Sequence, residues 1–276
     1  MKKKSWSLEL LSCKIIWGLS FLIFLLLTGT SLIFTRYFAA DYKKEIPYMK
    51  ISGNPWTILG AVLLGILLCW MIRYISEETL EGKRQVHKML VTVLVWCFAF
   101  GTIWVMFAVS MPVADQYSVA DSAKCFIEGN YGYLNYGEYL FYYPFQLGLV
   151  AWEELIFRLF GVNNYIALQM GNVFGIIGSI YAGYKVVWYL FDSRKTEAAY
   201  LLLTASCFPF LIYSSYIYND VLSVCLSLVV IWQMLRLLKT GKKSSICWMV
   251  IAGTMAVLIR SNSLIVLIAV GCILFI

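Results

Sequence analysis

The chain has 276 residues, of which 61% are hydrophobic and 17% aromatic, while only 13% are charged. Soluble domains are about 45–50% apolar and about 25% charged. The mean hydropathy of +0.78 therefore excludes a soluble globular enzyme and a disordered chain, and it indicates a polytopic membrane protein. The net charge of +7 does not predict nucleic-acid binding. The basic residues lie between apolar runs, and no basic face with interleaved aromatic residues occurs.

Eight apolar runs are candidate membrane spans, since a spanning helix needs about 20 mostly apolar residues. Six are long and the last two are shorter: 15–34, 56–75, 89–110, 167–191, 199–217, 220–238, 246–259 and 264–276. The first run is too long for a signal-peptide core, so we expect a retained anchor. The last run is still apolar at Ile276. We therefore expect the chain to be a fragment of a longer protein.

Lysine and arginine counts in short loops predict the orientation of the spans. Four basic clusters, one at the N-terminus and three in loops, predict a cytoplasmic location for these segments. They are Lys2, Lys3, Lys4 and Lys14; Lys83, Arg84 and Lys88; Arg194 and Lys195; and Arg236, Lys239, Lys242 and Lys243. The loop 111–142 has one lysine against four acids and should be external. The loop 36–56 disagrees, because it holds four basic residues yet must also be external.

The segment 143–160 cannot make a simple crossing, because the spans 89–110 and 167–191 already account for the predicted sidedness. Its charges Glu153, Glu154 and Arg158 would each cost about 2.5 to 3.5 kcal/mol at mid-bilayer. An interfacial or re-entrant helix avoids most of that cost, and Glu154 and Arg158 have the i,i+4 spacing of an ion pair. We therefore predict that 111–165, which we call the platform, lies outside the membrane.

The sequence thus predicts an all-α fold, a polytopic transmembrane helical bundle with an external loop that carries interfacial juxtamembrane helices. Residues 1–88 would form an N-terminal pair of transmembrane helices, and 89–276 would form the main transmembrane region. The expected location is the cell membrane, with several spans and a cytoplasmic N-terminus.

Asp115 is the first candidate for chemistry, because it follows the span 89–110 almost at once. An acid fixed at the exit of a span can bind a divalent cation or accept a proton from an attacking hydroxyl group. The structural alternative is a helix cap or a solvated acid at a helix N-terminus. Residue type alone leaves both open.

An aromatic, glycine-rich stretch, 131–146, follows in the same loop and contains Tyr143 and Gln146. Such a stretch suits a groove for a sugar or an isoprenoid phosphate, where rings stack and hydroxyl groups donate. It also suits an interfacial aromatic belt without any ligand.

Two further groups are predicted to reach the same face. Tyr218 and Asp220 lie between the spans 199–217 and 220–238, and Asp220 either caps the next helix or shares a metal ion with Asp115. Arg260 lies in a polar break between two short apolar runs. An arginine in that place is an anion ligand or a snorkelling terminal residue.

Other chemistry is poorly supported. His87 is the only histidine, and no GxSxG, HExxH or P-loop pattern occurs. Seven of the eight cysteines lie in or beside apolar runs and Cys125 is alone in a loop, so the sequence contains no disulfide framework. Catalysis would have to depend on carboxylates and cations.

The order of these motifs resembles a known family. An aspartate after a span, a Tyr-Pro loop before a helix that ends Phe-Arg-Leu-Phe-Gly, an external Tyr-x-Tyr-Asn-Asp and a span ending Arg-Ser-Asn occur together in 92–276. This pattern is similar to the integral-membrane glycosyltransferases of the GT-C fold, specifically family 39, the protein O-mannosyltransferase and aminoarabinose-transferase-like group. Residues 1–88 carry no part of the resemblance.

The resemblance implies transfer of a sugar from a polyprenyl-phosphate donor to an external glycan, lipid or protein acceptor. Asp115 would be the catalytic base or a metal partner with Asp220, and a divalent metal ion would be the cofactor. Tyr143, Gln146, Tyr218 and Arg260 would bind substrate, Arg260 through the lipid phosphate. Gln116 stands where many members have a second acid, and Phe145 where many have a second proline.

Two alternatives remain open, a multi-span transporter or lipid flippase and a non-catalytic membrane scaffold. A transporter predicts paired intramembrane charges and broken helices at matching places in two halves. A scaffold predicts that the aromatic loop is only a docking surface. Membrane lipids are expected partners in every case, and nucleic acid in none.

Overall fold

The computed structural model describes residues 8–41, 44–51, 55–77, 79–108, 110–218 and 220–275. The chain divides into two compact units, Met1–Leu67 and Leu68–Ile276, and each is described by itself. The predicted division at residue 88 falls inside helix α3 (Thr79–Ala108) of the second unit. The N-terminal Lys2, Lys3 and Lys4, which carried part of the orientation argument, lie outside the described residues.

The first unit contains helix α1 (Leu8–Ile33), a two-stranded antiparallel hairpin and most of helix α2 (Pro55–Arg73). Strands β1 (Phe34–Asp41) and β2 (Lys44–Ile51) pair from Phe34 with Ile51 to Asp41 with Lys44. The sequence predicted only a loop here. Aromatic and β-branched residues in this segment favour extended backbone, but only its basic residues were used for the prediction.

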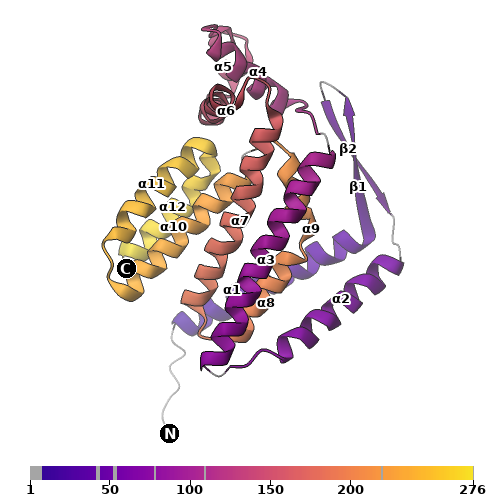
Figure 1. The fold of residues 1–276 in the computed structure, drawn as a ribbon, viewed down its shortest axis with the longest axis vertical. Coiled ribbons are helices and arrows are strands. Elements are labelled where there is room, and N and C mark those ends of the chain that lie inside the picture. Colours follow the sequence, from indigo (N-terminus) through magenta and orange to yellow (C-terminus); the bar gives the residue numbers. More distant parts are fainter. Residues whose placement is uncertain are drawn as a thin grey trace. The chain divides into compact units, whose positions relative to one another are not determined.

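The second unit is a helical bundle whose predicted spans are mostly confirmed (Figure 1). Three of its helices are long and apolar enough to cross a membrane: α3, α7 (Tyr165–Leu190) and α10 (Asp220–Thr240). Helices α11 (Ser244–Ile259) and α12 (Leu264–Phe275) are apolar but shorter. Helix α7 packs on α3 and α10, and α10 packs on α11. With α1, the described residues contain four such spanning helices, so the multi-span helical fold class is confirmed.

The run 199–217, which was expected to be one continuous span, is broken. It forms helix α8 (Arg194–Ala205), helix α9 (Phe208–Ile212) and the short helix η3 (Tyr213–Ser215), with a bend of 54° between the two parts. Pro209 explains the break, because proline has no N–H to donate and its ring clashes with the carbonyl group four residues earlier, at Ala205, where α8 ends.

Helix α3 begins ten residues earlier than the apolar run that predicted it. Lys83, Arg84 and Lys88 therefore lie on its first turns rather than in a loop. Glutamate, lysine, arginine and glutamine all favour helix, so the polar stretch extends the apolar one without a break.

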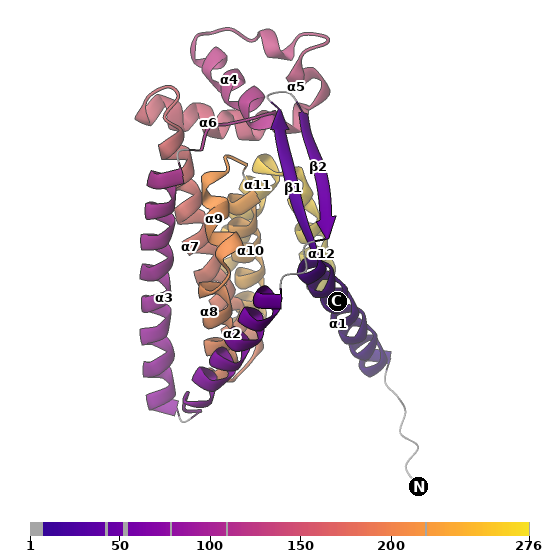
Figure 2. The ribbon, with the colours of Figure 1, turned by 90° about the vertical axis from the view of Figure 1, so that its right-hand side faces the viewer.

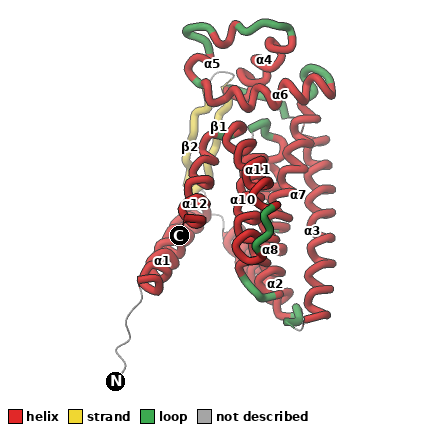
Figure 3. Tube along the Cα trace, turned by 90° about the vertical axis from the view of Figure 1, so that its left-hand side faces the viewer, coloured by secondary structure: helices red, strands yellow, loops and turns green. Residues whose placement is uncertain are grey.

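The platform contains five short elements. They are α4 (Asp115–Ile127), η1 (Gly132–Leu134), α5 (Tyr139–Tyr142), η2 (Pro144–Gln146) and α6 (Leu147–Phe160). Figures 2 and 3 show α6 lying across the ends of the long helices rather than alongside them. Glu154 and Arg158 form the predicted ion pair at 2.6 Å. The inference that 143–160 does not cross the membrane agrees with this arrangement.

A small core holds the platform together. Its members come from α4, α5, α6, the start of α7 and the connection before α10, and the best buried include Val119, Ala120, Ala123, Leu140, Leu149, Val150 and Phe157. Helix α6 also approaches helix α11 very closely at Gly148, where an added Cβ would lie 1.7 Å from the Leu258 carbonyl oxygen. Only glycine fits this contact.

Candidate functional site

The chain topology brings three connections to one end of the bundle. Helix α3 ends there, η3 leads there into α10, and α11 ends there before the short helix η4 (Ser261–Ser263) (Figure 1). The residues predicted from sequence follow these connections: Asp115 after the first, Tyr218 and Asp220 after the second, and Arg260 after the third. The platform lies at the same end.

Two buried amides of helix α7 fix two of these connections. The Gln169 Nε2 donates to the carbonyl oxygens of Ser110, at 2.9 Å, and Ser215, at 3.1 Å. The Asn172 Nδ2 donates to the carbonyl oxygen of Ser214 at 3.3 Å. A buried amide in an apolar helix is costly unless it is hydrogen-bonded, so these side chains are tied to the loops they hold. The sequence reasoning missed both, although a polar residue inside an apolar run is a visible signal.

The position of Asp115 is set by its neighbours. The Gln116 Oε1 accepts a hydrogen bond from the Ile217 N–H at 3.0 Å, which ties the first turn of α4 to the η3–α10 connection. Ala114 has φ of 49°, a conformation that a residue with a Cβ rarely adopts. Strain of this kind concentrates at sites where the surrounding structure fixes a side chain. Asp115 is the first residue of α4 and is exposed, while Ala114 holds the cap position.

Tyr139 is the centre of the group around Asp115. Its hydroxyl is buried. Burial, and next the negative charge of Asp115, raise the pKa of Tyr139, while the Gln146 amide lowers it. Tyr218 and Tyr143 are also close enough to raise this pKa. Tyr139, which the sequence did not single out, therefore has its pKa affected by four predicted residues, and its ring lies 5.0 Å from that of Tyr143.

Asp220 and Arg260 form a second group. The Arg260 Nε lies 3.0 Å from the Asp220 Oδ1, and the two side chains are about one-third exposed, at 34% and 36%. The Tyr213 hydroxyl donates to the Asp220 Oδ2 at 3.1 Å. Among the described residues, the Arg260 guanidinium has no other hydrogen bond or ion pair. Tyr218 lies two residues before Asp220 in the connection between η3 and α10.

A polar furrow of about 330 Å³ adjoins the Asp220–Arg260 pair. Its polar wall is formed by Ser223 and Ser227 of α10 with Asn262 and Ser263 of η4. The Ser223 and Ser263 hydroxyls are 2.8 Å apart. Asp220, Ser223 and Ser227 have the spacing of one helix face. This spacing is visible in the sequence, but it did not contribute to the prediction of the site.

The metal assignment is weakly supported by the residues present. The described part of the chain contains no group of three or more histidine, cysteine, aspartate or glutamate residues that would hold a metal ion. Asp220 already bonds to Arg260 and Tyr213. A divalent cation held by Asp115 and Asp220 stays a prediction, and the mechanism below does not use one.

Comparisons of the chain with protein-family models, with curated proteins and with solved structures found no match. The resemblance to family 39 therefore rests on the motifs alone, and the function is inferred from the site.

Proposed function

We propose that the chain is a membrane glycosyltransferase of the GT-C type, which moves a sugar from a polyprenyl-phosphate donor to an acceptor outside the cell. The observation that carries the proposal is the location of an exposed acid, Asp115, and a cation, Arg260, at the same end of the membrane helices. A lipid-linked donor needs its reacting atoms at this boundary, since its tail stays in the bilayer.

Charge distribution supports an external location for this end. The basic residues 83, 84, 88, 194 and 195 lie on α3 and α8 at the end of the bundle away from the platform, where Glu77 accepts from the Arg194 N–H at 3.0 Å. Basic residues mark the cytoplasmic side. The platform would then face outward with Asp115.

The proposed reaction is an inverting displacement. The acceptor hydroxyl oxygen attacks the anomeric carbon of the donor sugar, and the bond from that carbon to the phosphate oxygen breaks. Asp115 takes the proton of the hydroxyl group as general base. The polyprenyl phosphate leaves with both electrons of the broken bond, and Arg260 stabilises its negative charge. Atoms and charge balance without a further reactant.

The Asp220–Arg260 pair gives Arg260 a defined position before donor binding. The closest contact to Asp220 is made by Nε, and the five N–H donors of the guanidinium would also reach phosphate oxygens. The furrow beside the pair has serine and asparagine side chains that suit sugar hydroxyl groups. Tyr143 and Tyr218 would offer rings and hydroxyls to the same sugar.

A lipid flippase or transporter is the second candidate. The bend between α8 and α9 favours it, because transporters use broken helices at their binding sites. The described residues contain one such broken pair rather than two in matching halves. The pairing of Asp220 with Arg260 fits either function.

Transfer of radiolabelled sugar in proteoliposomes tests the proposal. The donors would be polyprenyl-phosphate hexoses and polyprenyl-phosphate aminoarabinose, with a membrane extract as acceptor. Asp115→Asn should reduce transfer by about 10²- to 10⁴-fold, because it removes the general base. Asp192→Asn, an exposed acid outside the platform, is the matched control and should leave transfer unchanged. Lipid scrambling by a chain that consumes none of the donors would favour the flippase instead.

A further inference from the structure

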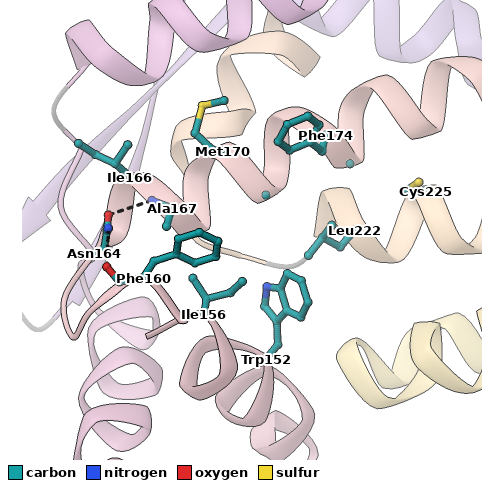
Figure 4. A pocket seen from close by; sticks show the side chains of 12 residues that line it. Trp152, Ile156, Phe160, Asn164, Ile166, Ala167, Met170, Phe174, Leu222 and Cys225 are labelled. Carbon is teal, nitrogen blue, oxygen red and sulfur yellow. Dashed lines mark hydrogen bonds between the residues drawn. The ribbon is translucent and has the colours of Figure 1, made fainter. Parts of the chain in front are cut away.

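A second hollow is lined by residues of α6, α7 and α10 and of the connection between α6 and α7 (Figure 4). Its volume is about 650 Å³, within the range of about 300–1,000 Å³ for small-molecule pockets. Leu222 and Cys225 of α10 form one side of it. Successive residues turn by about 100° around a helix, so these two face away from Asp220. We call this hollow the apolar groove.

Glycines of helix α7 create the space. Gly171 lies in the wall of the groove, and an added Cβ there would meet nothing closer than Trp152, at 3.8 Å. At Gly175 an added Cβ would lie 3.0 Å from Leu222 and from Val221, so this glycine allows α10 to approach. The remaining large side chains of the wall are Ile156 and Phe160 of α6 with Met170 and Phe174 of α7.

The wall offers almost no polar group to a ligand. The Asn164 Oδ1 accepts from the Ala167 N–H at 3.1 Å, and its Nδ2 donates to the Phe160 carbonyl oxygen at 3.0 Å. The exception is the indole N–H of Trp152, for which the described residues provide no hydrogen-bond acceptor. A ligand that fits this wall is a hydrocarbon chain with one hydrogen-bond acceptor near its end.

The side chains around the groove are those expected at the depth where such a chain begins. The Glu154–Arg158 ion pair on α6 marks the water-exposed side of that helix, and Trp152 and Phe160 lie on another side. Phe160 is 60% exposed and Phe174 is 61% exposed, so the edge of the groove presents large apolar side chains to the surroundings of the helices. Tryptophan is enriched at this level of a bilayer, where its ring is apolar and its N–H meets polar lipid atoms.

We propose that the apolar groove binds one acyl chain of a bilayer glycerophospholipid, whose ester carbonyl accepts a hydrogen bond from the Trp152 N–H. An isoprenoid phosphate would have its acceptor oxygens at Arg260, and the groove faces away from Arg260. A lipid here would fill the space between α6 and the long helices. The proposal does not depend on glycosyl transfer.

Fluorescence of the whole chain in nanodiscs tests this binding. The discs would contain phosphatidylcholine with bromine on the acyl chains near the ester, and plain phosphatidylcholine for comparison. The chain has 10 tryptophans, so Trp152 emission is the difference between the wild-type chain and Trp152→Phe. We expect brominated lipid to remove most of this emission, because bromine quenches indole on contact.

Two leucine substitutions sharpen the test. Gly171→Leu fills the groove and should restore the Trp152 emission in brominated discs. Gly271→Leu adds the same side chain to α12, where nothing lies within 4 Å of an added Cβ, and should leave the quenching intact. Equal Trp152 emission in brominated and plain discs would overturn the proposal, because a protein segment, a second copy or water would then cover the groove.

Mass spectrometry of the detergent-purified chain gives an independent result. Glycerophospholipid retained by the wild-type chain, and reduced in both Gly171→Leu and Trp152→Phe, supports the proposal. Trp152→Phe keeps the shape of the groove, so it answers the question even where Gly171→Leu fails to fold. A retained polyprenyl lipid in place of phospholipid would overturn it.

Discussion

The platform and the helical bundle each contain a buried glutamate, and the two differ in whether the carboxyl group has a partner. In the bundle, Glu197 is 1% exposed and is paired with Arg194 and hydrogen-bonded by Tyr184. In the platform, Glu153 is 0% exposed and both of its oxygens are without a hydrogen-bond partner among the described residues. Burial raises the pKa of Glu153 well above its ordinary value. The two acids therefore differ in their partners: the Glu197 carboxyl group has a cation and a hydroxyl group beside it, while the Glu153 carboxyl group is buried without either.

The largest expected effect follows from breaking the paired acid. Arg194→Ala leaves the Glu197 carboxylate buried without its cation, and removing one partner of a buried pair costs about 3–5 kcal/mol. We expect a clear drop in the thermal midpoint of the purified protein. Arg194→Ala combined with Glu197→Gln should recover part of the loss, and a double variant no better than the single one would contradict this role of the pair.

Removing the unpaired acid should have the opposite sign. Glu153→Leu replaces an unsatisfied buried polar group with an apolar one of similar size, which should stabilise the platform by about 1–3 kcal/mol. Hydrogen exchange of the α4 and α6 amides measures this effect locally. Slower exchange is expected, and faster exchange would show that Glu153 has a partner in solution.

The same acid gives the platform a dependence on pH. A carboxyl group whose pKa is raised on folding binds more protons in the folded than in the unfolded state. Platform stability should therefore be greatest at acidic pH, below the ordinary value of 4.5, and should fall as the pH rises toward the raised pKa. The slope is about 1.4 kcal/mol per pH unit for one group. Glu153→Gln should flatten the hydrogen-exchange profile of α6 between acidic and neutral pH.

The smallest effect belongs to the adjacent residue, Glu154. Its pair with Arg158 is partly exposed, and pairs of this kind contribute about 0.3–0.5 kcal/mol. Glu154→Gln should leave the pH profile of the platform unchanged, and it serves as the matched control for Glu153→Gln. A large effect at position 154 would indicate that the two acids act together.

The elements that could be predicted from sequence are those with a strong local signal. Apolar runs located α1, α2, α3, α7, α10, α11 and α12, and charge in an apolar stretch identified α6 as a helix that does not cross. The hairpin at 34–51 and the break before Pro209 were not predicted. The strand preference of the first was outweighed by its basic residues, and the single proline of the second by the long apolar run around it. The sequence also did not distinguish Glu153 from Glu154, although only Glu153 is buried in the structure.

The candidate site was predictable as a list of residues but not as an arrangement. Asp115, Tyr218, Asp220 and Arg260 follow helix ends, so alternation of the spans placed them on one face. The pairing of Arg260 with Asp220, and the central position of Tyr139, depend on side-chain contacts between distant parts of the chain. No sequence period encodes such contacts. The buried amides Gln169 and Asn172 were visible as polar interruptions and were overlooked.

The contact between Gly148 and Leu258 has a mechanical consequence. Backbone meets backbone there, without an intervening side chain to absorb motion, so α6 and the end of α11 must shift together. Arg260 comes two residues after Leu258. A phosphate that drew the Arg260 guanidinium toward itself would therefore also displace α6. Binding of a ligand beside η4 would in this way change the position of the platform.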